Sequence, residues 1–554
     1  MKLLAFFLLL LCIIPVNSVS ASNSNSTNNS KISQLNSINP TQLANDYSTL
    51  IEIYTNGLLH QAQLDGNNTY SLKWKKVFNE PGNSTTISQY YFGLYYGAAG
   101  IGTTFLDLYA NTKNQTYLDV AEKAGNYLIT SAKTSKYGYG WFRSEDSVAL
   151  YSSEKYGLAG IATFLIYLYQ ESSNKTFLNY AESTLNLLYN TKQYTEYGFS
   201  WDYRLPESTA ITDYIYGVTG IAKSFLKAYE ATNNKTYLTI SINATSWVMN
   251  QSEYTSLDQT GLRRVLYSQD PSYFEYFTGY QSGAAGIGDF LLELYNKTNN
   301  EDYLLYAKQL ANWLVYKEDG KGYWSDYNAV DYLTDQNTIN SEGTFLGYSA
   351  GSSGAGTYFM DLYRVTQDSK YLGPVIRVKD FLLNNIQTNG TQIYWKDQIN
   401  GHYANRIETG LSLGVAGIGL FFTNYYSLFG GTDIINTLNG IKEFYTSITT
   451  NNGLVPYVIN SSTVIYDSSY LEGLAGIVTF VLDAKMSLET NPLVESSVLS
   501  NIGTYDINTI TTWTKCYEVA CTNSVTSDVG YISILAILVI PVVRIIRKRR
   551  SSDK

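Results

Sequence analysis

The chain of 554 residues carries 47 acidic and 38 basic side chains, which gives a formal net charge of −9 at pH 7. This acidic balance argues against nucleic acid as a partner. Charged residues make up 15% of the chain, against about 25% in a typical protein, and Tyr, Asn, Ser and Thr take their place. Such a surface keeps its hydrogen bonds when carboxylates are protonated, so we expect acidic surroundings for this protein.

The first segment, residues 1–21, has the pattern of a signal peptide. Lys2 precedes an apolar run from Leu3 to Pro15, and small residues follow up to Ala21. Residues 22–39 are rich in Ser and Asn and predict a flexible leader. The remainder of the chain is therefore expected to be exported.

An amphipathic helix is expected over residues 41–61, with the sequence TQLANDYSTLIEIYTNGLLHQ. The segment TYSLKWKK follows, with Trp74 near its end. These two features precede a repeat array and resemble the second half of one of its units.

A motif of the form G-x-x-G-[IA] then occurs seven times, at intervals of 59 to 68 residues. In the first copy, YGAAGIGTTFLDLY, the residues Ile101, Phe105 and Leu108 fall on one helix face. Glycine at a helix start costs up to ~1 kcal/mol, so we expect close approach of a neighbouring backbone there. The regular spacing predicts a repeat architecture. The first glycines of the seven copies are Gly97, Gly157, Gly217, Gly283, Gly351, Gly414 and Gly473.

Each repeat is expected to contain a helix, a polar turn, a second helix and a long aromatic loop. In the first repeat the turn is Asn114-Gln115-Thr116, and the second helix begins YLDVAEKAGNYLI. A helical hairpin of this kind cannot bury its own apolar face and must stack on its neighbours. In four repeats the loop contains a tryptophan, namely Trp141, Trp201, Trp324 and Trp395.

The ends of the array favour a closed ring. The seventh copy supplies a first helix over residues 472–487, but no clear second helix follows it. The helix at 41–61, with Trp74 in the place of the aromatic loop, supplies the missing partner. We therefore predict an all-α fold, an α/α toroid of seven inner and seven outer helices over residues 40–488.

The C-terminal part of the chain predicts a membrane anchor. Residues 489–528 form a spacer, residues 529–546 an apolar transmembrane helix, and residues 547–554 a basic cytoplasmic tail. The alternative is an apolar tail that packs on the domain. In an exported chain Cys516 and Cys521 are expected to form a disulfide.

Sequons of the form N-x-[ST] are also abundant and would accept glycans if the chain is exported. A chain rich in Asn and Thr also produces them by chance. The glycosylation sites that we predict are Asn67, Asn83, Asn114, Asn174, Asn234, Asn296 and Asn389.

Seven such helix starts in a toroid resemble the lanthionine synthetase C-like family, over about residues 40–488. The family's cyclases hold zinc with a Cys before the glycines of one repeat and a Cys-His pair in the next. The matching places here are Ser349 and Ser412-Leu413. Because thiolate and imidazole ligands are missing, the resemblance implies the fold without the metal, and we expect no cofactor.

In a closed ring, the N-termini of the inner helices meet at one mouth, each with a partial positive charge of ~0.5. A glycosidase needs two carboxylates ~5 to 9.5 Å apart, and tyrosine and tryptophan rings suit sugars. Acids before helix starts are also ordinary caps, and tryptophan loops are ordinary packing elements. The candidate catalytic residues are Glu154, Asp213, Glu408 and Glu472. The candidate substrate-binding residues are Tyr96, Tyr156, Tyr216, Trp141, Trp201, Trp324 and Trp395.

Two functions remain open at this point, because the same architecture serves several chemistries. One is a membrane-anchored extracellular protein that binds or processes glycans at the toroid mouth, as a hydrolase or a lyase. The other is a non-catalytic surface protein that binds peptide, protein or glycan. A pair of acids across the mouth would favour the first, and a mouth filled by tyrosines the second. Peptide modification, as in lanthionine synthetases, would need a metal site that the sequence does not show.

Overall fold

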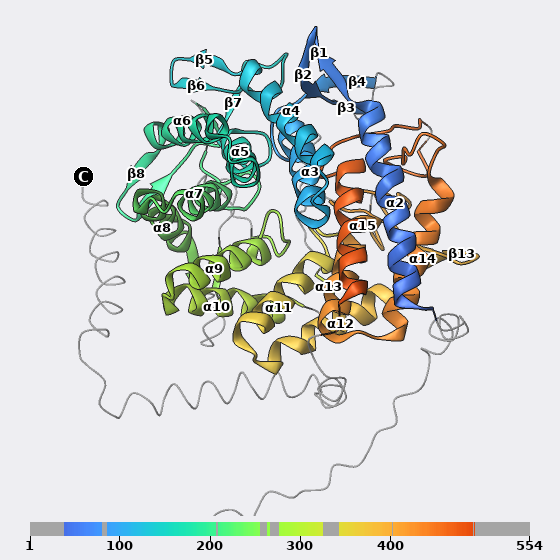
Figure 1. Ribbon diagram of the computed structural model, residues 1–554. Coiled ribbons are helices and arrows are strands. Elements are labelled where there is room, and N and C mark those ends of the chain that lie inside the picture. Colours follow the sequence, from blue (N-terminus) through green and yellow to red (C-terminus); the bar gives the residue numbers. More distant parts are fainter. Residues whose placement is uncertain are drawn as a thin grey trace, which may run out of the picture.

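The computed structural model describes most of the predicted toroid (Figure 1). The signal peptide, the C-terminal anchor, the cysteine pair Cys516 and Cys521, and Asn83 lie outside the described residues. Within the described part, no helix is both long and apolar enough to cross a membrane. The described residues are 38–79, 86–205, 209–254, 263–265, 276–318, 320–324, 343–401, 403–461, 463–490 and 492.

The inner layer consists of seven helices, each of which begins directly after the first glycine of a repeat. Each inner helix contacts the next, and the last contacts the first, so that the described helices form a closed ring (Figure 1). This arrangement confirms the prediction from the glycine motif. The inner helices are α3 (Ala98–Thr112), α5 (Leu158–Ser172), α7 (Val218–Thr232), α9 (Ala284–Thr298), α11 (Ser352–Thr366), α13 (Val415–Phe429) and α15 (Leu474–Glu489).

The outer layer pairs one helix with each inner helix. The N-terminal helix α2 packs along α15, where Tyr47 meets the ring of Phe480 edge-on at 6.0 Å between centroids. The predicted closure of the seventh hairpin by the N-terminal helix is thus confirmed. In addition to α2 (Pro40–Gln61), the outer helices are α4 (Gln115–Ser131), α6 (Lys175–Thr191), α8 (Lys235–Asn250), α10 (Glu301–Lys317), α12 (Leu372–Asn384, preceded by the 3-10 turn η1, Ser369–Tyr371) and α14 (Thr432–Ile448).

Short antiparallel strand pairs lie between the helices, mostly in the predicted aromatic loops, and all but β7 with β10 join strands that are consecutive in the chain. The pairs are β1 (Gln63–Asp65) with β2 (Asn68–Lys73), β3 (Lys75–Asn79) with β4 (Thr86–Tyr90), β5 (Lys133–Ser135) with β6 (Gly138–Gly140), β7 (Leu150–Tyr151) with β10 (Arg204–Leu205), β8 (Gln193–Thr195) with β9 (Gly198–Ser200), β11 (Ser252–Tyr254) with β12 (Arg263–Val265), and β13 (Gln387–Asn389) with β14 (Gln392–Tyr394).

A belt of backbone hydrogen bonds closes the ring at the start of the inner helices. The residue two places before each first glycine donates its N–H to the carbonyl of the corresponding residue in the next repeat, over 2.8 to 3.3 Å. Leu471 of the last repeat donates to Tyr95 of the first at 3.0 Å. In chain order the belt consists of Tyr95, Lys155, Ile215, Gln281, Ser349, Ser412 and Leu471.

The motif glycines are required by this packing. A Cβ atom added to Gly100 would overlap the carbonyl oxygen of Leu94 and would lie 2.8 Å from the Cβ atom of Tyr470 in the neighbouring repeat. The close backbone approach expected from the sequence is therefore present, and the backbone belongs to the loop that leads into the same helix.

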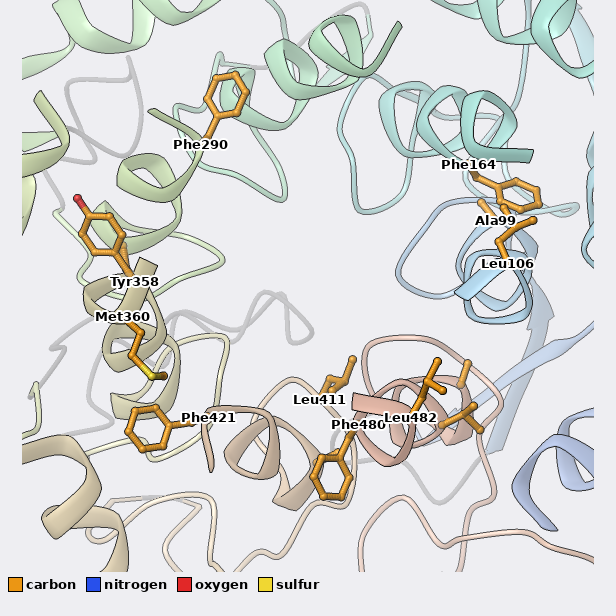
Figure 2. Packing of buried hydrophobic residues seen from close by; sticks show 14 of the residues in the cluster. Ala99, Leu106, Phe164, Phe290, Tyr358, Met360, Leu411, Phe421, Phe480 and Leu482 are labelled. Carbon is orange, nitrogen blue, oxygen red and sulfur yellow. The ribbon is translucent and has the colours of Figure 1, made fainter. Parts of the chain in front are cut away.

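The apolar core lies between neighbouring inner helices as well as between the two layers. Figure 2 shows Phe164, Tyr358, Phe421 and Phe480 at the contacts between inner helices. Phe164 of α5 occupies the space beside Gly102 of α3, where a Cβ atom would come within 2.5 Å of the phenyl ring. The glycines thus allow the inner helices to pack closely around the axis.

The polar turns explain part of the sequon pattern. Asn114 is the N-cap of α4, and its side chain accepts a hydrogen bond from the backbone N–H of Thr116 at 3.1 Å. Asn174 and Asn234 cap α6 and α8 in the same way. Asparagine therefore has a structural role in these places as a helix cap. The three residues are exposed, and their glycosylation stays a prediction.

Candidate functional site

Two positions remain partly exposed along the inner helices, whose other residues before the last turn are buried. They lie six and ten residues after the first glycine, one helical turn apart and hence on one face. Because outer helices and neighbouring inner helices cover the other sides, this face is directed at the ring axis, and we call it the axial face. Its exposed or half-buried residues are Thr103, Asp107, Tyr167, Lys223, Lys227, Asp289, Glu293, Asp361, Leu420, Asn424, Thr479 and Asp483.

The interactions of Lys223 place this face at the axis. The charge of Lys223 influences Glu154 of the second repeat, Asp289 of the fourth, and Tyr95 and Tyr470 of the first and seventh. Groups from four other repeats are thus near enough to interact electrostatically with Lys223, as expected for a side chain directed at the ring axis.

Tyrosine rings and carboxylates meet on the axial face. The half-buried rings of Tyr280 and Tyr348 lie 4.7 Å apart between centroids, and the hydroxyl of Tyr280 donates to Asp289 Oδ2 at 2.5 Å. Lys227 of α7 forms an ion pair with Glu293 of α9. This surface therefore offers aromatic faces next to groups that bind hydroxyls.

On the other side of the belt, at the mouth, the three candidate tyrosines come together. Tyr96 and Tyr156 lie 5.4 Å apart between ring centroids, and Tyr156 and Tyr216 lie 6.2 Å apart. The ammonium group of Lys155 donates to the hydroxyl of Tyr216 at 2.6 Å and lies 4.7 to 5.2 Å from the three rings. The mouth of the first three repeats is thus filled with tyrosines.

Glu472 is held in a buried ion pair. Lys76 donates to Glu472 Oε2 at 2.5 Å and to Asp467 Oδ2 at 2.6 Å, and the hydroxyl of Tyr96 donates to Glu472 Oε1 at 2.7 Å. Burial alone would raise the pKa of Glu472, but Lys76, Lys155 and Tyr96 together lower it. Lys76 and Asp467 were not among the sequence candidates. Only their positions in the repeat, two residues after Trp74 and six residues before Gly473, could have indicated that they lie at the mouth.

Glu408 is engaged in a similar way. It pairs with Arg406, accepts a hydrogen bond from the hydroxyl of Tyr457 at 2.9 Å, and donates its backbone N–H to Asp397 Oδ1 at 2.8 Å. Arg406 Nε also lies 3.0 Å from Asp397 Oδ2. Both acids are almost fully buried, so neither presents a free carboxylate at the mouth.

Asp213 and Glu154 are buried without a direct ion pair in the described residues. Asp213 Oδ1 accepts the backbone N–H of Tyr216 at 2.7 Å and so stabilises the turn before α7, whose N-cap is Gly217. Glu154 lies on the axial side of the belt, 2% exposed, against Gly220 of α7. Within the described residues its Oε2 atom has no hydrogen-bond partner. Burial raises the pKa of each carboxyl to about 7, and Lys223 opposes the shift at Glu154.

We expect the unfolding free energy to decrease between pH 5 and pH 8. Because the pKa values of Glu154 and Asp213 are raised to about 7 in the folded protein, the folded state binds their protons more tightly than the unfolded state. This contribution is fully present below about pH 4 and is lost as the pH rises through about 7. The loss from these two groups should be on the order of 5 kcal/mol, measured by denaturant unfolding at both pH values.

The variants Glu154→Gln and Asp213→Asn provide the control, since each removes one titrating group with little change in shape. Each should remove about half of the contribution of this pair. The rest of the pH dependence should remain, because the pKa values of Asp107, Asp289, Asp397 and Asp483 are also raised to about 7. A wild-type protein whose stability is constant or increases from pH 5 to pH 8 would contradict the burial of these carboxyls.

The tryptophans lie behind the mouth, in the core. Trp141, Trp201, Trp324 and Trp395 are buried, and each indole N–H donates to a carbonyl of the preceding outer helix over 2.7 to 2.8 Å. This placement gives them a packing role, and no ring face among them is open to solvent. Trp74 has the same role after α2.

The two serines at the family's zinc positions do not fit a zinc ion. Ser349 Oγ and Ser412 Oγ lie 2.8 Å apart and hydrogen-bond to each other. Hydroxyl groups supply neither the thiolate nor the imidazole that zinc requires. Across the described part of the chain, no three His, Cys, Asp or Glu side chains are grouped so that they could hold a metal.

Comparison with curated proteins found no match. Among solved structures, the chain is similar to cellobiose 2-epimerase from Spirochaeta thermophila (14% identity, TM-score 0.47, covering 76% of this chain and 99% of that one). It is also similar to nisin cyclase (16%, 0.45, 72% and 89%) and to a family 76 glycoside hydrolase, a mannosidase, from Bacteroides thetaiotaomicron (12%, 0.46, 81% and 98%). Similarity at this level carries no argument about function.

A family model gives the decisive comparison. The model described as "Lanthionine synthetase C-like protein" matches residues 88–496, which include the seven glycine motifs and all seven inner helices. The match covers well over half of the chain, and the chain therefore belongs to the lanthionine synthetase C-like family.

Proposed function

We propose that this toroid binds a glycan outside the cell, at the mouth and along the axial face, without cleaving it. The observation that carries the proposal is the half-exposed pair of rings, Tyr280 and Tyr348, next to Asp289. Sugar rings stack on aromatic faces, and their hydroxyls donate to carboxylates; sites that combine a few polar groups with aromatic walls are typical of small-ligand binding.

Binding without cleavage is supported by the state of the mouth carboxylates. A glycosidase needs one protonated and one free carboxylate that both reach the substrate. Glu472 and Glu408 are neutralised by Lys76 and Arg406, and Asp213 caps a backbone turn. The mouth itself is filled by Tyr96, Tyr156 and Tyr216, which are 3 to 6% exposed and leave no open space beside these acids for a cleavage site.

A second function, glycan hydrolysis or elimination, is supported by Glu154. Its pKa of about 7 suits a group that donates or accepts a proton near neutral pH. Glu293, a half-exposed carboxylate of α9, is close enough to raise that pKa and is the partner that such a reaction would use.

The location of the protein outside the cell and its membrane anchoring are also part of the proposal. The signal peptide at 1–21 and the transmembrane helix at 529–546 would place the toroid outside the cell and anchor it in the membrane. The exposed positions of Asn67, Asn114, Asn174, Asn234, Asn296 and Asn389 support glycosylation. Protease treatment of intact cells should remove the toroid from the membrane fraction; protection of the toroid would contradict this topology.

A glycan array and a polysaccharide-hydrolysis screen test the function. We expect the purified full-length protein in detergent to bind a subset of glycans at pH 5 and pH 7 and to release no sugar. If the wild type cleaves a glycan and Glu154→Gln does not, the result would contradict binding without cleavage and support hydrolysis or elimination. Binding of peptides in place of any glycan would overturn the proposal.

A further inference from the structure

The loops of the toroid place one side chain each in equivalent slots at the mouth. Lys76 and Arg143 both lie two residues after a buried tryptophan, Trp74 and Trp141. Each lies against the residue six places before the first glycine of the preceding repeat, which is Asp467 for Lys76 and Tyr91 for Arg143. Each also lies against the residue directly before the first glycine of the next repeat, which is Tyr96 for Lys76 and Tyr156 for Arg143. The near-sevenfold symmetry of the ring therefore allows the two slots to be compared position by position.

The slot of Lys76 contains its own counter-ions. Asp467, six places before Gly473, and Glu472, one place before it, both form ion pairs with Lys76. Tyr96 of the next repeat covers the ammonium group at 4.7 Å from its ring centroid.

The slot of Arg143 has tyrosines where the slot of Lys76 has acids. Tyr91 takes the place of Asp467, with its ring centroid 5.4 Å from the guanidinium carbon, and Tyr96 takes the place of Glu472. Tyr156 of the next repeat covers the guanidinium at 4.3 Å, closer than the corresponding contact of Lys76. The cation is thus surrounded by rings.

Nothing in the described part of the chain neutralises this guanidinium. No described carboxylate pairs with it, and its buried Nε atom has no hydrogen-bond partner there. The groups that influence it are the hydroxyls of Tyr91, Tyr151, Tyr156 and Tyr203. Cation–π contacts attract a cation but leave its charge and its hydrogen-bond donors unsatisfied. Arg143 and Tyr203 remain partly exposed, so a ligand can reach the slot.

We propose that the Arg143 slot binds the anionic group of an acidic glycan, a carboxylate or a sulfate carried on a sugar ring. A guanidinium recognises such planar or tetrahedral oxyanions through paired N–H donors. The nearby Lys155 adds positive charge, and the rings of Tyr151 and Tyr203, with centroids 5.0 Å apart, provide a surface for the attached sugar. The sugar part of this inference rests on the proposed glycan binding; the anion part does not.

The test compares glucuronate, glucose 6-sulfate and neutral glucose as probes, titrated into the full-length protein in detergent. The wild-type protein should bind at least one of the two anionic sugars about tenfold or more tightly than glucose, and the two arms distinguish carboxylate from sulfate. Raising the salt concentration should weaken that binding. Arg143→Gln should remove the preference, and Arg143→Lys should keep part of it.

A second variant distinguishes a binding role from damage to the fold. Tyr91→Asp supplies Arg143 with an internal carboxylate, as Asp467 does for Lys76. It should leave the protein folded, at the wild-type melting temperature or above it, and should abolish the anion preference. Lys136→Gln, an exposed change on the same loop, removes the same charge as Arg143→Gln and should have no effect.

The proposal is overturned if Arg143→Gln or Tyr91→Asp binds the anionic sugars as the wild type does. It also fails, while glycan binding stands, if the wild type binds neutral glycans with no preference for acidic ones. If glucuronate or the sulfated sugar binds through Arg143 but no glycan on an array does, the slot stands and the proposed function fails.

Discussion

Replacing Gly100 with alanine is expected to prevent the toroid from folding, or to destabilise it by more than about 4 kcal/mol. The new Cβ atom would overlap the carbonyl oxygen of Leu94, which is backbone and cannot rotate away. Relief would require a shift of the belt at the point where Leu471 of the last repeat bonds to Tyr95 of the first. Thermal unfolding of the purified variant, or its failure to accumulate, measures the effect.

Gly373→Ala provides the matched control. Gly373 lies in the outer helix α12, and the nearest atom to an added Cβ is the flexible Nη1 of Arg377, at 3.3 Å. This substitution should leave stability unchanged or raise it by up to ~1 kcal/mol, because alanine favours helix. A Gly100→Ala protein that melts within about two degrees of the wild type would contradict the packing of the belt.

Replacing Lys76 with methionine is expected to cost about 3 to 5 kcal/mol of stability. The substitution keeps most of the side-chain volume but leaves Asp467 and Glu472 buried without their shared cation. Two uncompensated carboxylates then repel each other in a site with almost no access to water. Denaturant unfolding at pH 7 measures the loss.

Removing both charges tests whether electrostatics is the cause. In the triple variant Lys76→Met, Asp467→Asn, Glu472→Gln, the buried groups are neutral, and more than half of the lost stability should return. If the single variant unfolds at the wild-type denaturant concentration, or if the triple variant is no more stable than the single one, the ion pairs of Lys76 do not stabilise the fold.

The fold could be predicted from the sequence because the signal was repeated. One G-x-x-G-[IA] motif is weak evidence for any structure, but seven at regular spacing predict stacked hairpins. Closure could also be predicted, since the seventh inner helix lacked a partner and residues 41–61 supplied one. The belt of backbone hydrogen bonds was not foreseen, because main-chain pairing between repeats leaves no trace in residue type.

The candidate site was predicted only in part. The sequence placed Tyr96, Tyr156 and Tyr216 at the mouth because each precedes a first glycine, and the structure brings them together. It did not indicate which acids are neutralised. Lys76 and Glu472 are 396 residues apart in sequence, and only the ring brings them into contact. The tryptophans illustrate a second difficulty, which is that the sequence does not indicate burial. The same loop sequence is compatible with an indole ring that packs in the core and with one that faces solvent.

The axial face was missed for a related reason. Asp289 and Glu293 lie on the inner helix α9, most of whose other residues are apolar. In the sequence alone, two acids in such a helix do not indicate which way they face. Only the closed ring shows that these positions share one axis with Lys223 of another repeat. The face exists because seven helices enclose it, so no single repeat predicts it.

The measurement that tests this account most directly is calorimetric titration of the best oligosaccharide from the array into the wild type, Asp289→Asn and Asp119→Asn. Asp119 is an exposed acid of the outer helix α4, and its replacement is the same Asp-to-Asn change away from the axial face. We predict that Asp289→Asn weakens binding about tenfold or more, while Asp119→Asn binds as the wild type does. Equal affinities for all three proteins would show that the glycan does not occupy the axial face.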